Sequence, residues 1–166
     1  MKATAGAFQQ VSGADFPAPV GTTREILRTA VKKLPLHALV VDDEPLIRWS
    51  VTETLADLGL DVAQADCAAS ALQALTTTAM PFDVIVLDLR LPDMNDLSLL
   101  ATIRQLLPET PVVLMTAFGT PEIIAGARRL GVREVLNKPF ELGDLNRLVI
   151  EAGTRTRDFG HTEALS

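Results

Sequence analysis

Five short aliphatic runs alternate with segments of helical length between residues 36 and 153, and this alternation constrains the fold most strongly. The runs lie at 38–41, 62–65, 84–87, 112–115 and 132–136. They do not alternate polar with apolar residues, which is typical of strands covered on both faces. Repeated strand–helix units of this kind predict an α/β fold, with a doubly wound, five-stranded parallel sheet of flavodoxin-like (βα)5 order.

Start and stop signals place a helix after each run. The first helix begins at Pro45, because proline is favoured at the first helical position, and ends before Gly59. The next helices are expected over 68–77, 96–107 and 121–130, and the last over 141–152, stopped by Gly153.

The ends of the chain differ from this domain, which we place at 36–153. Residues 1–21 are rich in Ala, Gly, Ser and Pro and predict a flexible leader. Residues 22–35 carry an apolar stripe and predict a short amphipathic helix, with packing on its own domain favoured over a role in dimerisation. Residues 154–166 are polar, have no apolar period and predict a flexible tail. We expect a monomer or a weak homodimer.

Composition excludes several classes of protein. The net charge of −6 and the pI near 4.9 disfavour direct nucleic-acid binding, which rests on basic surfaces. No apolar run approaches the ~20 residues that span a bilayer, and no secretory signal is apparent. The single cysteine rules out an internal disulfide framework. We therefore expect a cytoplasmic protein without membrane contact.

Polar residues stand within three positions of the ends of four of the five runs. They are Asp42, Asp43 and Glu44 after the first run, Asp88 after the third, Thr116 after the fourth and Lys138 after the fifth. Because ligands of open parallel sheets bind at the carboxyl ends of the strands, we expect these side chains to converge on one edge.

Clustered carboxylates raise one another's pKa unless a cation lies among them. Mg²⁺ suits a site of a few carboxylates, waters and a phosphate, so the sequence predicts Mg²⁺ as the cofactor. A carboxylate can also attack phosphorus and form an aspartyl phosphate. Phosphoryl transfer then needs positioning and charge stabilisation, which an ammonium and a hydroxyl can supply.

Four motifs resemble the receiver domain of bacterial two-component response regulators. Residues 39–45 are Leu-Val-Val-Asp-Asp-Glu-Pro, 83–94 are Asp-Val-Ile-Val-Leu-Asp-Leu-Arg-Leu-Pro-Asp-Met, 113–117 are Val-Leu-Met-Thr-Ala, and 138–140 are Lys-Pro-Phe. The resemblance covers about residues 36–152, in order and at ordinary spacing. Residues 47–49 and 115–119 look more like those of receivers attached to transcriptional activators of the nitrogen-regulation type. Two alternatives therefore stay open: the chain is a piece of a longer regulator, or it is a stand-alone module.

The resemblance implies a role for each matching residue, beginning with Asp88 as the phosphoacceptor. Asp42, Asp43, Asp88 and the Arg90 backbone carbonyl would hold Mg²⁺. Lys138, the Thr116 hydroxyl and the Ala117 backbone N–H would contact the phosphoryl group, and the peptide before Pro139 would be cis. The donor would be a sensor histidine kinase or a histidine phosphotransfer protein. The output would be a contact with an unknown protein, through the face formed by 117–152.

Two positions depart from the family pattern. Val135 stands where the family usually has Tyr or Phe, so the usual inward rotation of an aromatic ring cannot occur in its standard form. Asp96 stands where a glycine normally serves a left-handed backbone, although Asp96 can also cap the third helix. Both departures concern the switch downstream of phosphorylation and not its chemistry.

Three functions follow from these residues. The first is a phosphoacceptor module of a two-component system or phosphorelay, which is not an enzyme beyond self-phosphorylation and slow autodephosphorylation; bulky Arg90 and Phe118 beside the site suggest the slow turnover. The second is a phosphorylation-independent interaction protein with a receiver fold. The third, a haloacid-dehalogenase-like phosphatase, is disfavoured because its second aspartate would stand at Arg90.

Overall fold

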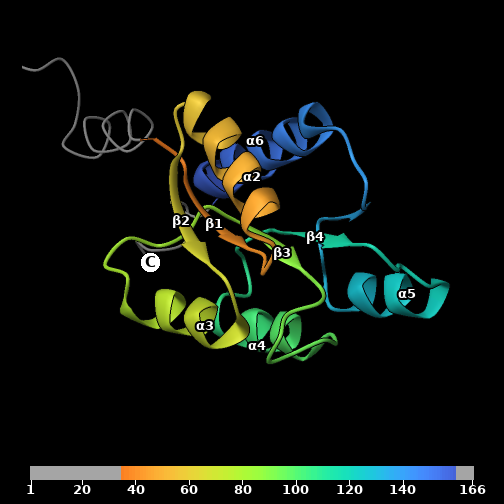
Figure 1. Ribbon diagram of the computed structural model, residues 1–166. Helices are drawn as coiled ribbons and strands as arrows, with labels where there is room; N and C mark the ends of the chain where they lie inside the picture. Colours follow the sequence, from red (N-terminus) through yellow and green to blue (C-terminus); the bar gives the residue numbers. More distant parts are fainter. Residues whose placement is uncertain (1–34, 160–166) are drawn as a thin grey trace, which may run out of the picture.

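Strands and helices alternate through residues 35–159, the part of the chain that this computed structural model describes (Figure 1). The strands are β1 (His37–Val41), β2 (Asp61–Ala65), β3 (Val84–Asp88), β4 (Val112–Thr116) and β5 (Glu134–Asn137). The helices are α2 (Pro45–Asp57), α3 (Ala68–Thr77), α4 (Ser98–Leu106), α5 (Pro121–Arg129) and α6 (Leu142–Phe159). The predicted leader, most of the predicted helix at 22–35 and the end of the predicted tail lie outside the described residues.

The five strands form one parallel sheet in the order β2-β1-β3-β4-β5. This is the doubly wound, flavodoxin-like arrangement that the alternating pattern predicts. All residues of the three central strands, β1, β3 and β4, are buried, while the edge strands β2 and β5 are partly exposed. The order places the carboxyl end of β1 directly between those of β2 and β3.

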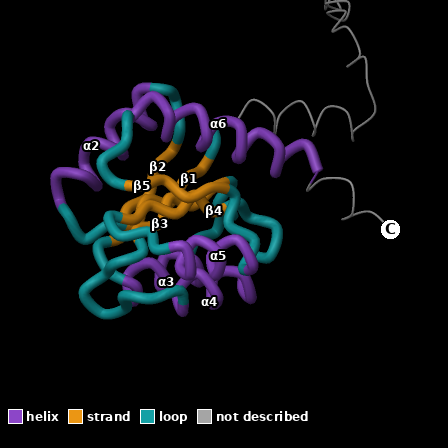
Figure 2. Tube along the Cα trace, turned by 90° about the vertical axis from the view of Figure 1, so that its right-hand side faces the viewer, coloured by secondary structure: helices purple, strands orange, loops and turns teal. Residues whose placement is uncertain are grey.

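Helices cover both faces of the sheet (Figure 2). Alternate residues of a strand point to opposite faces, so Ala38 and Val40 pack with α2 and α6, whereas Leu39 and Val41 pack with α3, α4 and α5. The two clusters account for the aliphatic character of the central strands, because each of their faces must be apolar. This double cover holds the strand ends, and the polar residues behind them, in fixed positions.

Two predicted boundaries are wrong by two residues for local reasons. α4 begins at Ser98 instead of residue 96, because the Asp96 carboxylate accepts the Ser98 N–H at 2.8 Å and so lies ahead of the first turn. β5 begins at Glu134, because the N–H of Val132 still bonds to Ala127 at the end of α5 (3.1 Å).

The last helix is longer than the sequence indicates. Instead of stopping at Gly153, α6 continues to Phe159, so the first residues of the predicted tail are helical. A Cβ at Gly153 would lie 3.2 Å from a methyl group of Leu36, which shows that glycine here serves close packing against the chain before β1. None of the helices in 35–159, α6 included, is long and apolar enough to cross a membrane.

Candidate functional site

The carboxyl ends of four strands bring the predicted site residues together. Asp88 and Thr116 are the last residues of β3 and β4, Asp42 follows β1, and Lys138 follows β5. Asp42 and Thr116 are fully buried and Asp88 nearly so, at 5% exposure. Polar side chains are seldom buried to this degree without partners, so their contacts define the site.

The Lys138 ammonium links the carboxylates. Its Nζ lies 2.8 Å from Oδ2 of Asp42 and 3.3 Å from Oδ2 of Asp88, and the lysine side chain is only 9% exposed. The more exposed Glu44 carboxylate lies 3.4 Å from the same Nζ. The family resemblance pairs Lys138 with Asp88, whereas in this structure its shortest contact is with Asp42.

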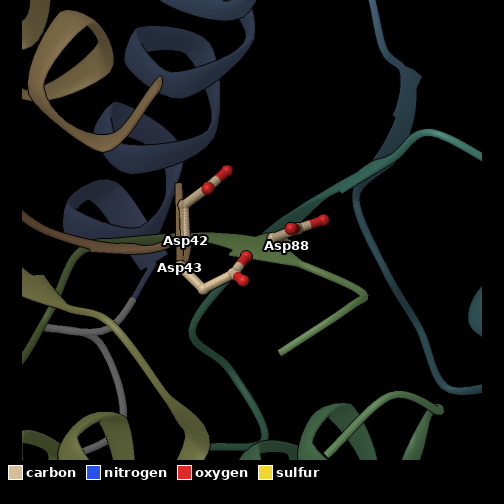
Figure 3. Close-up of side chains that lie close together, drawn as sticks. All are labelled: Asp42, Asp43 and Asp88. Carbon is tan, nitrogen blue, oxygen red and sulfur yellow. The ribbon is translucent and has the colours of Figure 1, made fainter. Parts of the chain in front are cut away.

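Three aspartates could hold a metal ion. Each of Asp42, Asp43 and Asp88 offers a carboxylate oxygen, and the three oxygens lie within 4.8 Å of one another. Figure 3 shows Asp42 and Asp43 at the end of β1, with the Asp43 side chain directed toward Asp88. Asp43 is exposed while the other two are buried, so the cluster opens to solvent on one side.

The surroundings of Asp88 disfavour its negative charge. Burial raises the pKa of its carboxyl group above the usual range, and the charge of Asp42 acts in the same direction. Lys138 and the backbone N–H of Arg90 lower this pKa without cancelling the rise. The positive charge of Lys138 is therefore not enough to return the pKa of Asp88 to its usual value.

Lys138 responds in the opposite direction. Burial lowers the pKa of its ammonium, but the hydrogen bond to Asp42 and the charges of Asp42 and Asp88 outweigh burial and raise the pKa above its usual value. The lysine is therefore charged at neutral pH. Its backbone is held as well, since its N–H bonds to the Thr116 carbonyl at 2.7 Å and the Lys138–Pro139 peptide is cis, as predicted.

The Thr116 side chain contacts the loop that follows it. Its Oγ1 accepts the backbone N–H of Phe118 at 3.1 Å. Ala117 is exposed between these two residues, and the exposed Arg90 places its guanidinium over the Phe118 ring. The loops after β3 and β4 thus meet above the strand ends.

The structure shows the contacts of Val135 and Asp96, the two departures from the family pattern. Val135 is half-buried and packs on the cluster beneath α3, α4 and α5. Within 35–159, positive φ occurs only at Gly59 and Gly131, so the left-handed backbone expected at Asp96 is wrong. Asp96 instead accepts the N–H of Ser98, the first residue of α4, although the N-cap residue itself is Leu97 and not Asp96 as predicted.

Sequence reasoning missed two polar contacts that fix the site. Arg48, on the first turns of α2, donates from Nη1 to the Asp42 carbonyl at 2.6 Å. Asp93, in the loop after β3, accepts two N–H groups from the start of α3. No sequence motif marks either contact: Arg48 donates to a backbone carbonyl six residues earlier, and the N–H groups that Asp93 accepts are 24 and 25 residues earlier.

Comparison with known proteins decides the family. Residues 38–150 match the family model described as "Response regulator receiver domain". The chain belongs to this family. A receiver domain is the phosphate-accepting module of two-component signalling, interacts with histidine kinases and is not an enzyme in the usual sense.

Individual relatives agree with this membership. The chain is 40% identical over 115 residues to the response regulator protein PilR of Pseudomonas aeruginosa, covering 69% of this chain and 25% of PilR. It is 36% identical over 115 residues to the DNA-binding transcriptional regulator NtrC of Klebsiella pneumoniae, covering 69% and 24% respectively. This receiver domain therefore spans about a quarter of the length of these relatives.

Solved structures share the fold. NtrX from Brucella abortus superimposes with a TM-score of 0.66 at 33% identity, covering 74% of this chain and 28% of NtrX. The Francisella response regulator 1452 receiver domain gives a TM-score of 0.67 at 29% identity, covering 73% of this chain and 98% of that domain.

Proposed function

We propose that Asp88 accepts a phosphoryl group from a phosphohistidine of a sensor histidine kinase or a histidine phosphotransfer protein. One observation carries this proposal: Asp42, Asp43 and Asp88 converge within 4.8 Å at the carboxyl edge of the sheet, and Lys138 lies 3.3 Å from Asp88. Nucleophile, metal ligands and a cation are thereby gathered where parallel sheets bind their ligands.

Mg²⁺ is the proposed cofactor, held by Asp42, Asp43, Asp88 and the Arg90 backbone carbonyl. The donor set consists of oxygens, which Mg²⁺ prefers. Three aspartates and one lysine leave a net formal charge of about −2, and the pKa of Asp88 is raised by its burial and, to a smaller extent, by the charge of Asp42. Bound Mg²⁺ would supply positive charge and stabilise the phosphoryl oxygens.

The transfer itself uses Asp88 as a nucleophile. One carboxylate oxygen attacks phosphorus and forms the O–P bond, while the P–N bond to the donor imidazole breaks and its electron pair stays on the nitrogen. Lys138, already close to Asp88, contacts the new phosphoryl oxygens. The Thr116 hydroxyl and the Ala117 N–H contact them from the end of β4.

The phosphorylated form signals through the face formed by 117–152, by contact with another protein in the cytoplasm. This face includes the loop after β4, α5, β5 and much of α6. Its exposed Phe118, at 60% exposure, is separated from the Thr116 hydroxyl by one residue and is hydrogen-bonded to it through its own N–H. A movement of that hydroxyl is therefore passed directly to the surface.

Phosphorylation with acetyl phosphate and Mg²⁺ tests the proposal. The parent protein should become labelled, and Asp88→Asn should not, as measured with radiolabel or by gel mobility shift. Asp43→Asn, which keeps the nucleophile, should be labelled only at higher Mg²⁺ concentration. Label that persists in Asp88→Asn would place the acceptor elsewhere.

A second candidate, a receiver fold that signals without phosphorylation, is favoured by the absence of an aromatic ring at Val135. A pull-down with and without beryllofluoride, a stable mimic of the phosphoryl group, separates the two. Partners captured only with the mimic support the phosphorylation-dependent module. Identical partners in both samples, and also with Asp88→Asn, support the alternative.

A further inference from the structure

Asp93 joins two loops that are distant in the sequence. It lies in the loop between β3 and α4, and its two carboxylate oxygens accept the backbone N–H groups of Ala68 (2.8 Å) and Ala69 (2.9 Å). These are the first two residues of α3. Helix N-termini carry unsatisfied N–H groups and a partial positive charge, so a carboxylate binds there more strongly than a neutral group.

The start of α3 is itself connected to the acidic site. Two residues separate α3 from Ala65, the last residue of β2, and the Ala65 carbonyl accepts the N–H of Asp42 at 3.1 Å. Because β1 lies between β2 and β3 in the sheet, the loops after β2 and β3 flank the end of β1. The Asp93 contact therefore ties together the two sides of the segment that carries Asp42 and Asp43.

The loop that Asp93 holds is short and closed on itself. Leu91 and Met94 exchange backbone hydrogen bonds of 2.9 and 3.3 Å, which leaves Asp93 at the tip. At the other end, the N–H of Leu89 bonds to the Met115 carbonyl at 2.9 Å. Arg90 lies between these two anchors, so the position of its carbonyl depends on both of them.

We propose that Asp93 is a positioning residue for Mg²⁺: by fastening the loop after β3 to the start of α3, it sets the Arg90 carbonyl against Asp42 and Asp43. The inference rests on the proposed function, because it needs Mg²⁺ at the acidic cluster. The low pKa of Asp93, which its bonds to Ala68 and Ala69 produce, keeps the carboxylate charged under the conditions of phosphorylation.

Asp96 provides a matched control in the same loop. Its carboxylate also accepts a helix N–H, that of Ser98 at 2.8 Å, but this bond stays within its own segment at the start of α4. Loss of either carboxylate leaves a helix N-terminal N–H without its acceptor, so both variants should unfold at a lower urea concentration than the parent. Only the loss of Asp93 also separates the two loops.

The experiment measures the Mg²⁺ requirement of the full chain. Mg²⁺ binding is followed directly by titration calorimetry, and labelling of Asp88 by acetyl phosphate is measured across Mg²⁺ concentrations. For Asp93→Ala we expect about tenfold weaker Mg²⁺ binding, as is typical when a group that orients a metal ligand is lost. Labelling at saturating Mg²⁺ should stay within about twofold of the parent, and Asp93→Asn, which keeps one acceptor oxygen, should be intermediate.

Asp96→Ala should bind Mg²⁺ like the parent while losing similar stability to urea. The inference is overturned if Asp93→Ala binds Mg²⁺ like the parent, or if Asp96→Ala weakens binding equally. Should Asp93→Ala fail to fold, Asp93→Asn decides by the same criteria. A parent that binds Mg²⁺ without labelling Asp88 contradicts the proposed function alone, since the calorimetry still tests Asp93.

Discussion

The guanidinium carbon of Arg90 lies 4.4 Å from the centroid of the Phe118 ring. This contact joins the loop after β3, which follows the proposed phosphoacceptor, to the loop after β4, which follows Thr116. Both side chains are exposed, so the pair lies at the outer surface of the site and not in the core. Because the two loops follow Asp88 and Thr116, we expect the pair to cover part of the path by which water reaches an aspartyl phosphate at Asp88.

Removal of either partner should therefore accelerate autodephosphorylation. Exposed cation–π pairs contribute about 0.5–1 kcal/mol. This corresponds to about a two- to fivefold change in the equilibrium between the closed and the open Arg90–Phe118 contact. Arg90→Ala and Phe118→Ala should shorten the lifetime of the phosphorylated protein by that factor, measured as loss of label after the donor is removed. Leu106→Ala, an exposed apolar residue at the end of α4, is the control and should leave the lifetime unchanged. Equal lifetimes in all four proteins would exclude a shielding role for the pair.

Lys138→Met should destabilise the protein most strongly when Mg²⁺ is absent. The Lys138 ammonium is the cation between buried Asp42 and Asp88, and removing one partner of a buried ion pair lowers the free energy of unfolding by about 3 kcal/mol. Added Mg²⁺ should restore much of this loss and bind more tightly than in the parent, because the ammonium no longer competes for the carboxylates. Urea denaturation with and without Mg²⁺ measures both effects.

The control for Lys138 is a surface ion pair on α6. Arg147 lies 3.5 Å from Asp144 with both side chains about 60% exposed, so Arg147→Met should change stability by less than about 1 kcal/mol and show no Mg²⁺ dependence. Labelling of Asp88 should fall by about a hundredfold or more in Lys138→Met, because a charge that stabilises the phosphoryl oxygens is lost. Full labelling of this variant would remove Lys138 from the proposed chemistry.

Gly119→Ala should disturb the loop after β4. A Cβ at this position would lie 2.7 Å from Oδ1 of Asn137 and 3.1 Å from Cγ2 of Thr116. The Asn137 side chain is exposed and can move aside, but Thr116 is fully buried, so the added methyl group should cost about 1 kcal/mol. Gly143→Ala is the matched control, because nothing lies within 4 Å of its Cβ, and alanine should stabilise α6 by about 0.5–1 kcal/mol. Urea denaturation should show these opposite signs; the same sign for both would contradict the tight packing at Gly119.

Sequence alone predicted that these side chains converge, because strand ends are local features. Val86 and Leu87 are aliphatic since β3 is covered on both faces, and Asp88 is the first residue at which that requirement ends. The same reasoning places Asp42 after β1. In a parallel sheet all such ends share one edge, so the convergence of side chains from distant segments follows from the alternating pattern.

What the sequence could not predict depends on contacts between segments. Gly153 resembles a helix stop, yet it lies inside α6, where a Cβ would come within 3.2 Å of a Leu36 methyl group and glycine therefore serves close packing. Asp93 resembles an ordinary loop residue, yet it caps a helix 24 and 25 residues earlier in the chain. Neither relationship has a period or a local motif, so both require the folded structure.

The hydroxyl of Thr116 should control how phosphorylation is passed to α5. Its Oγ1 accepts the Phe118 N–H at 3.1 Å, and in our proposal the hydroxyl moves onto the phosphoryl oxygens. With Val135 in place of an aromatic ring, loss of this hydrogen bond is the direct route by which the loop after β4 senses that movement. Thr116→Val keeps the shape of the side chain but removes the bond, which contributes about 1 kcal/mol.

Amide hydrogen exchange with and without beryllofluoride measures this route. In the parent, the mimic should change exchange across 117–129, which contains the loop and α5. In Thr116→Val, exchange at Phe118 should be faster before the mimic is added, and the response to the mimic should be lost, because the N–H already lacks its acceptor. Thr116→Ser retains the hydroxyl and should respond like the parent. A full response in Thr116→Val would mean that the signal leaves Asp88 by another path, with Lys138 and the β5 strand before it as the remaining connection to α5.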